Sequence, residues 1–132
     1  NASRILEDQA RRTTASDPQI LTGLHRCKAS AAIVLRAIEQ GQWDVIGHEF
    51  NLQWQRKCLT SSLATSRDLD AMVAAMLQAG AYGAKVCGAG GGGFIVAVCE
   101  DVEAVQLRLS SSGMPMRRVR PSEGGVHHVV RW

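Results

Sequence analysis

The sequence lacks a long apolar run and a marked excess of charge of either sign. No apolar stretch approaches the roughly 20 residues that a membrane-spanning helix needs, and no signal-like segment is visible at the start. The net charge of +3 is mild, and basic residues cluster only at 11–12 and 117–120. A solvated face explains such short clusters better than a nucleic-acid surface does. We therefore expect neither a membrane partner nor a nucleic-acid partner.

The sequence also lacks a metal-binding motif. The four cysteines show no CxxC pairing and no histidine at zinc-binding spacing: Cys27, Cys58, Cys87 and Cys99. Each lies in an apolar pattern, where a free cysteine behaves as a small buried hydrophobe, and this favours a reducing, cytoplasmic setting. His127 and His128 are adjacent on an expected strand, so their rings point to opposite faces and do not converge on one ion. We predict no metal site.

Length and composition are those of one globular domain. Hydrophobic residues make up 45% and charged residues 20% of the 132 residues, which suffices for a single apolar core. We therefore assign residues 1–132 to one domain. The first residue is not methionine, and we expect the chain to be a piece of a longer protein.

Helical signals fill the first half of the chain. Asp17 followed by Pro18 is typical of a helix start, and Gly41 of a helix end. Between them, apolar residues recur at helical spacing and predict a long amphipathic helix: Ile20, Leu21, Leu24, Cys27, Ala31, Val34, Leu35 and Ile38. Three further helices are predicted, at residues 3–14, 43–59 and 67–78.

The second half reads as strands around one short helix. The β-branched and apolar content predicts four strands, at residues 84–87, 94–99, 116–120 and 126–132. A helix is expected around 102–109, and a turn at 121–125. Helices followed by strand, strand, helix, strand, strand predict the α+β class, with an antiparallel four-stranded sheet packed against several helices.

The densest feature is the glycine run at 88–93, in which five of six residues are glycine. Its letters satisfy G-x-G-x-x-G, but a β-branched run follows where a dinucleotide-binding fold needs a helix. The phosphate loop of nucleotide hydrolases is excluded as well, because no Lys-Ser or Lys-Thr pair follows. Two interpretations stay open: a structural hairpin turn, or a loop whose bare backbone N–H groups face a phosphate or substrate.

The stretch "GAYGAKVCGAGGGGFIVAV" at 80–98 resembles the third, C-terminal glycine-rich motif of the GHMP kinase superfamily, which includes galactokinase, homoserine kinase, mevalonate kinase and phosphomevalonate kinase. The resemblance extends upstream through "SRILEDQ", "LHRCKASAAIVLRAIEQGQWDVIGHEFN" and the segment 54–94, and so covers nearly the whole chain. It is greatest with D-glycero-D-manno-heptose 7-phosphate kinases and related sugar kinases. This resemblance implies a ferredoxin-like C-terminal domain.

The resemblance also implies a longer, two-domain kinase that needs ATP and Mg²⁺. In that superfamily an N-terminal domain carries the nucleotide phosphate loop, the Mg²⁺ ligands and the catalytic Asp, and the active site lies between the domains. No such loop occurs in residues 1–132. We expect no catalytic residue in this chain, a sugar or sugar phosphate as ligand, a covalently linked N-terminal kinase domain, and an inactive chain when alone.

The motif match suggests which residues would line the site. By analogy, the loop Gly88, Ala89, Gly90, Gly91 and Gly92 would face the cleft, together with Lys57 and Lys85. For Lys85 the alternative is a solvent-exposed position at the sheet. A valine at Gly90 or Gly91 is expected to enter the cleft and stop transfer while the domain stays folded.

Trp54 resembles a residue beside the sugar pocket, but its helical register with Ile46 and Phe50 favours the core. Ser61, Ser62 and Thr65 either bind a polyhydroxylated ligand or cap the next helix.

Two other classes of function remain open. A domain of this fold could be a non-catalytic module that binds a small metabolite or a protein, or a structural domain that associates through an apolar face. An upstream "GLGSS"-type loop would favour the kinase. Because a domain separated from its partner exposes apolar surface, we also expect the isolated chain to self-associate.

Overall fold

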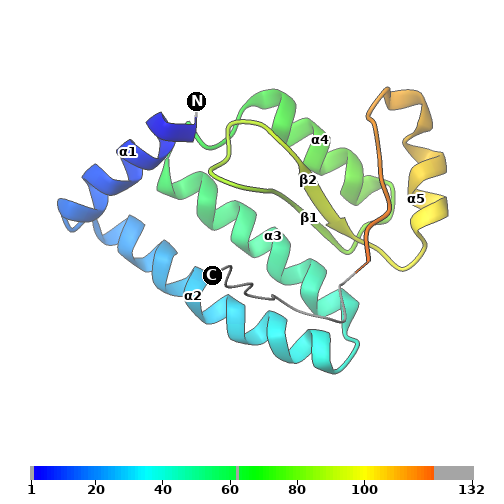
Figure 1. The fold of residues 1–132 in the computed structure, drawn as a ribbon, viewed down its shortest axis with the longest axis horizontal. Helices are drawn as coiled ribbons and strands as arrows, with labels where there is room; N and C mark the ends of the chain where they lie inside the picture. Colours follow the sequence, from blue (N-terminus) through cyan, green and yellow to red (C-terminus); the bar gives the residue numbers. More distant parts are fainter. Residues whose placement is uncertain (1, 62, 121–132) are drawn as a thin grey trace, which may run out of the picture.

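The computed structural model describes residues 2–61 and 63–120 (Figure 1). The helices are α1 (Ala2–Thr14), α2 (Pro18–Glu39), α3 (Trp43–Thr60), α4 (Arg67–Gln78) and the short α5 (Val102–Arg108), and the strands are β1 (Gly83–Val86) and β2 (Ile95–Val98). A 3-10 turn, η1 (Ser110–Ser112), follows α5. This arrangement confirms the α+β class. In the described part of the chain, no helix is both long and apolar enough to cross a membrane.

The helices α2 and α3 form an antiparallel pair (Figure 1). The helix α2 begins as predicted, with Pro18 in its first turn and an Asp17 carboxylate oxygen accepting from the Gln19 N–H at 3.0 Å. Its buried side, however, carries mostly small residues, namely Ile20, Gly23, Ser30 and Ala37. Of the predicted apolar stripe, Leu24, Leu35 and Ile38 are 44%, 58% and 48% exposed. The predicted stripe is confirmed in part, since Ile20 is buried and Leu21, Cys27 and Val34 are half-buried. The other buried positions carry small residues, which allow close contact between helices.

The strands β1 and β2 form an antiparallel hairpin in which Lys85 pairs with Val96. Side chains alternate along β1, so Ala84 and Val86 are buried on one face while Lys85 lies half-buried on the other. The helix α3 crosses β1 so closely that a Cβ atom at Gly83 would overlap the Gly47 carbonyl. This contact fixes the face of α3 that carries Phe50 and Gln53 against Lys85.

The apolar core lies among α3, α4, β1 and α5. It joins Trp54, Leu69, Val73, Met76, Ala79, Ala84, Val86, Val105 and Leu109. Trp54 is buried, as its helical register predicted. Leu69, Val73 and Met76 supply the buried face of α4, whereas Met72 and Leu77 are exposed.

The predicted strand at 116–120 is wrong, and the described residues contain a two-stranded sheet rather than a four-stranded one. The segment instead follows α5: Met116 packs against the core, and Arg118 forms an ion pair with Glu103 at 2.5 Å. The free edge of β1 is satisfied by Asn51, which accepts from the Ala84 N–H at 3.0 Å and donates to the Tyr82 carbonyl at 3.1 Å. The predicted turn at 121–125 and strand at 126–132 lie outside the described residues.

Candidate functional site

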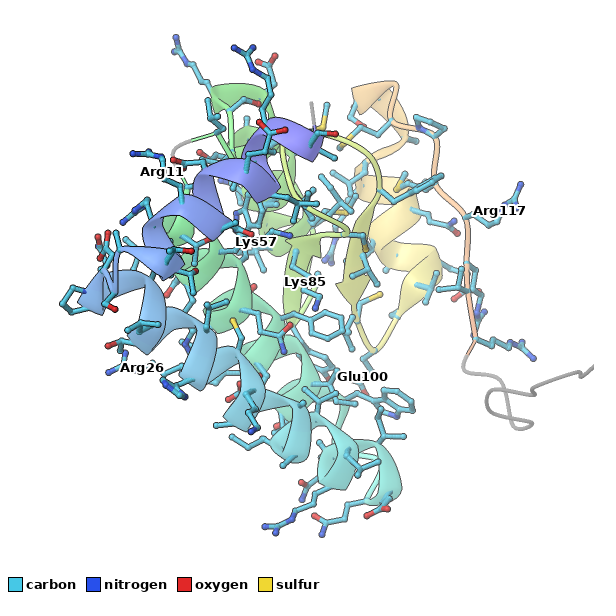
Figure 2. All side chains as sticks on the ribbon, turned by 60° about the vertical axis from the view of Figure 1, so that its left-hand side comes forward. Arg11, Arg26, Lys57, Lys85, Glu100 and Arg117 are labelled. Carbon is cyan, nitrogen blue, oxygen red and sulfur yellow. The ribbon has the colours of Figure 1, made fainter. Side chains whose placement is uncertain are left out.

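A cleft of about 390 Å³ opens between the N-terminal helices and the end of β1. The polar groups that line it come from α1, α3 and β1: Gln9, Gln53, Lys57, Thr60 and Lys85. The apolar side chains of Trp54 and Leu24 also line the cleft. Lys57 and Lys85 lie beside each other within the domain, whereas the labelled arginines lie at its periphery (Figure 2). The cleft therefore presents two cations and several neutral hydrogen-bonding groups.

Lys57 connects α3 to the glycine run. Its ammonium donates a hydrogen bond to the Gly88 carbonyl oxygen. Burial lowers the pKa of Lys57 below its usual value, and the neighbouring Lys85 charge lowers that pKa further. A bound anion would offset both effects, because it would stabilise the ammonium form.

Lys85 is held by two residues of α3. Its ammonium donates to the Gln53 side-chain oxygen, and it lies 4.7 Å from the centre of the Phe50 ring. A cation at this distance is attracted to the face of an aromatic ring. Of the two predicted positions for Lys85, the structure therefore shows the one inside the cleft.

Behind Gln53 lies a buried polar chain. The Gln53 amide N–H donates to the Ser30 hydroxyl oxygen at 2.8 Å, and that hydroxyl donates to a Glu49 carboxylate oxygen at 2.5 Å. Ser30 and Glu49 are almost fully buried, and an Arg56 nitrogen lies 3.9 Å from the same carboxylate oxygen. None of these buried residues was predicted as part of the site. The sequence did contain an indication of them, because the polar residues at 49 and 53 share a helix face with the apolar residues at 46, 50 and 54.

All five glycines of the run have a positive backbone φ, whereas Ala89 does not. The angle φ is +72° at Gly88, +99° at Gly90, +70° at Gly91, +143° at Gly92 and +102° at Gly93. Residues other than glycine rarely adopt such values, which accounts for the density of glycine here.

Two members of the run also pack tightly against the domain itself. The Gly91 N–H donates to the Ala64 carbonyl at 2.6 Å. A Cβ atom at Gly90 would lie 2.5 Å from that same oxygen, and one at Gly91 would lie 2.8 Å from Ile5 Cδ1. A valine at either position would therefore strain the fold, which corrects the expectation that it would only enter the cleft. At Gly88 and Gly92 the added atom would meet nothing within 4 Å.

The structure brings together some of the predicted site residues. Lys57, Lys85 and Gly88 line the cleft, whereas residues 89–92 lie further along the loop. Cys87, predicted to be buried, is exposed where β1 leaves the cleft.

The polar residues near the end of α3 make local contacts. The Ser61 hydroxyl accepts from the Leu63 N–H at 3.2 Å, and Thr65 donates to an Asp70 carboxylate at 2.6 Å. Of the two predicted roles, these contacts favour capping over ligand binding. Ser62 lies outside the described residues. Within the described residues, no three His, Cys, Asp or Glu side chains are grouped as a metal site would need.

The family described as GHMP kinases C terminal matches residues 34–114, a range that contains α3, both lysines and the whole glycine run. The chain belongs to the GHMP kinase C-terminal family. The fold of this GHMP kinase domain is similar to that of L. major mevalonate kinase, crystallised in complex with R-mevalonate, with a TM-score of 0.76 and 19% identity. The match covers 84% of this chain and 34% of that kinase, so the domain spans about a third of the kinase's length. No curated protein sequence matches the chain.

The cleft of the GHMP kinase domain is rich in groups that can bind a ligand. Two ammonium groups, the Thr60 hydroxyl and the amide groups of Gln9 and Gln53 surround the cleft. Such an arrangement can bind and orient an anionic, hydroxylated ligand.

Proposed function

We propose that this domain forms the substrate-side wall of an ATP-dependent small-molecule kinase that phosphorylates a hydroxyl group of a sugar or sugar phosphate similar to heptose 7-phosphate. The observation that carries this proposal is the two-lysine cleft beside the glycine run, in a domain of the GHMP kinase C-terminal family. An N-terminal domain would bind ATP and Mg²⁺ and supply the catalytic base. By itself the 132-residue chain would be inactive.

Each group of the cleft has a task in this proposal. Phosphoryl transfer is accelerated mainly by positioning and by stabilisation of charge, so a domain without a catalytic base still contributes to the rate. Lys57 and Lys85 would hold an anionic group of the ligand. Trp54 and Leu24 would exclude water from one side, and Thr60 and Gln9 would offer hydrogen bonds to its hydroxyl groups. Bound Mg·ATP would supply the phosphoryl group.

The test is calorimetric titration of the 132-residue chain with heptose 7-phosphate and, separately, with Mg·ATP. We expect heat of binding with heptose 7-phosphate and none with Mg·ATP, because the nucleotide site would lie on the other domain. Lys57→Met should weaken heptose 7-phosphate binding about tenfold, the size of one lost charged hydrogen bond. Lys28→Met, an exposed lysine on α2, is the matched control and should leave binding unchanged.

The same ligands should then be tested with the full-length protein for phosphate transfer. Transfer from ATP that falls in the Lys57→Met variant supports the kinase. Binding of heptose 7-phosphate with no transfer to any sugar would support the alternative, a non-catalytic metabolite-binding module. Clear Mg·ATP binding by the 132-residue chain would contradict the assignment of the nucleotide to an N-terminal domain.

A further inference from the structure

The hydrogen bonds behind Lys85 run in one direction. Lys85 donates to Gln53, Gln53 donates to Ser30, and Ser30 donates to the carboxylate of Glu49. This series of hydrogen bonds thus begins at the Lys85 ammonium in the cleft and ends at the buried Glu49 carboxylate. It passes from β1 to α3, then to α2 and back to α3. Hydrogen bonds aligned in this way polarise and strengthen one another in a low-dielectric interior.

This directionality fixes the orientation of the Gln53 amide. The Glu49 carboxylate can only accept hydrogen bonds, so the Ser30 hydroxyl proton points toward it and the Ser30 oxygen is left to accept from Gln53. With its NH₂ group used on Ser30, Gln53 presents its oxygen to Lys85. The reverse orientation would place an NH₂ group against an ammonium, two donors facing each other.

The consequence for Lys85 is a fixed position. A lysine side chain has many rotamers and ordinarily extends its ammonium into water. Here the Phe50 ring and the Gln53 oxygen hold the ammonium in the cleft. An ammonium has three donors, and Gln53 uses one, so others are free for a ligand. Lys57 lines the same cleft from α3.

We propose that Gln53, oriented by Ser30 and the buried Glu49, is a positioning residue that holds Lys85 in the cleft, where Lys85 and Lys57 together bind a phosphate group of the ligand. This inference rests on the proposed function for the identity of the natural ligand, but its core, phosphate binding that depends on Gln53 through Lys85, can be tested without any kinase reaction.

The test is a double-mutant cycle on the 132-residue chain with inorganic phosphate as the probe. The dissociation constant is measured from the NMR shifts of the lysine Hε–Cε signals. We expect phosphate to shift the Lys85 and Lys57 signals, and Lys85→Met to weaken binding about tenfold. Gln53→Met should weaken binding about fivefold in the presence of Lys85 and have no further effect in the Lys85→Met background.

Matched variants separate positioning from general damage to the fold. Gln55→Met changes an exposed glutamine of the same helix and should leave phosphate binding unchanged. If the NMR spectrum shows that the Gln53→Met variant has lost structure, Gln53→Asn takes its place in the cycle. The shorter asparagine side chain keeps a polar amide but cannot reach Lys85. Equal weakening by the Gln53 variant with and without Lys85 would overturn the proposal, as would the absence of a phosphate-induced shift at Lys85.

Two sources of the phosphate group are distinguished by competition. Heptose 7-phosphate and Mg·ATP are each added at equal concentration to the phosphate-bound chain. We expect only heptose 7-phosphate to displace the bound inorganic phosphate. This result would mean that the site binds the phosphate group of the sugar phosphate that accepts the phosphoryl group. Displacement by Mg·ATP would keep the phosphate site but contradict the nucleotide placement of the proposed function. A full-length protein without transfer activity, with the Gln53–Lys85 coupling intact, would overturn the proposed function alone.

Discussion

At the scale of single residues, the cleft is defined by two lysines, and the Lys85 charge helps to lower the pKa of Lys57. Lys57 is partly removed from water, and the Lys85 ammonium lies in the same cleft. A bound anion would favour the charged form of Lys57 and so offset this lowering. The two lysines are also held differently, because Lys57 donates to a backbone carbonyl and Lys85 to a side chain.

The mutual repulsion can be measured at Lys57. Because the pKa of Lys57 is lowered in the folded chain, the unfolded chain binds more protons between that lowered value and about 10.4. The Lys57 contribution to stability therefore rises with pH across this window. Lys85→Met should raise the pKa of Lys57, because it removes one of the two causes of the shift. An NMR pH titration of the Lys57 Hε–Cε signal measures it.

Lys28→Met is the matched control for this titration, since Lys28 is exposed on α2. It should leave the pKa of Lys57 unchanged. An unchanged pKa of Lys57 in the Lys85→Met variant would mean that the two ammonium groups do not interact, and the shared phosphate site would lose its electrostatic basis.

At the scale of elements, glycines set how closely segments approach. Gly83 permits the crossing of β1 over α3 at Gly47, and this crossing places Lys85 against Gln53. The glycine run has a second role, since Gly91 attaches the β1–β2 loop to the connection that follows α3. The structural interpretation of the run therefore holds for Gly90 and Gly91, whereas a ligand-binding role for the run stays a prediction.

The two kinds of glycine should differ in stability measurements. Gly83→Ala should lower the free energy of unfolding by about 3 kcal/mol, because the new methyl group overlaps the Gly47 carbonyl and α3 must shift. Gly88→Ala should cost about 1 kcal/mol, since it meets only the strain of a positive φ in open space. Urea unfolding followed by circular dichroism measures both. Equal losses would mean that the close crossing at Gly83 costs no more than the positive φ at Gly88, which would contradict a tight contact between β1 and α3.

Elements with local signals were predictable from the sequence. The cap at Asp17 and the helical periodicity located the helices. The glycine motif suggested Lys85 and the run as site residues, and the resemblance of α3 to a helix beside the sugar pocket suggested Lys57; Lys57, Lys85 and Gly88 line one cleft. The segment 116–120 was not predictable, because its β-like composition says nothing of whether a strand edge is free, and Asn51 occupies the free edge of β1. The hydrogen bonds that link Ser30, Glu49 and Gln53 behind Lys85 form only when α2, α3 and β1 are packed together. The periodicity of residues along one helix does not show how that helix packs against other elements.

At the scale of the whole molecule, several large apolar side chains of the described residues are exposed. Phe94, directly after the glycine run, is 85% exposed, and Leu6 and Leu63 are about half exposed. Leu6 follows Ile5 in the chain, and both Ile5 and the Leu63 carbonyl lie against Gly91, so these exposed residues belong to the end of the domain that carries the run. In the proposed two-domain kinase this end would face the rest of the protein. In the isolated chain it is available to a second copy.

The 132-residue chain should therefore self-associate in a way that depends on this end. In sedimentation velocity, we expect the weight-average sedimentation coefficient to rise with concentration, because apolar surface of this kind is buried on association. Phe94→Ser should reduce the rise. Leu107→Ser, which changes an equally exposed apolar residue on α5, is the matched control and should leave it unchanged. A chain that stays a monodisperse monomer at high concentration, or equal effects of both variants, would contradict a specific apolar face beside the glycine run.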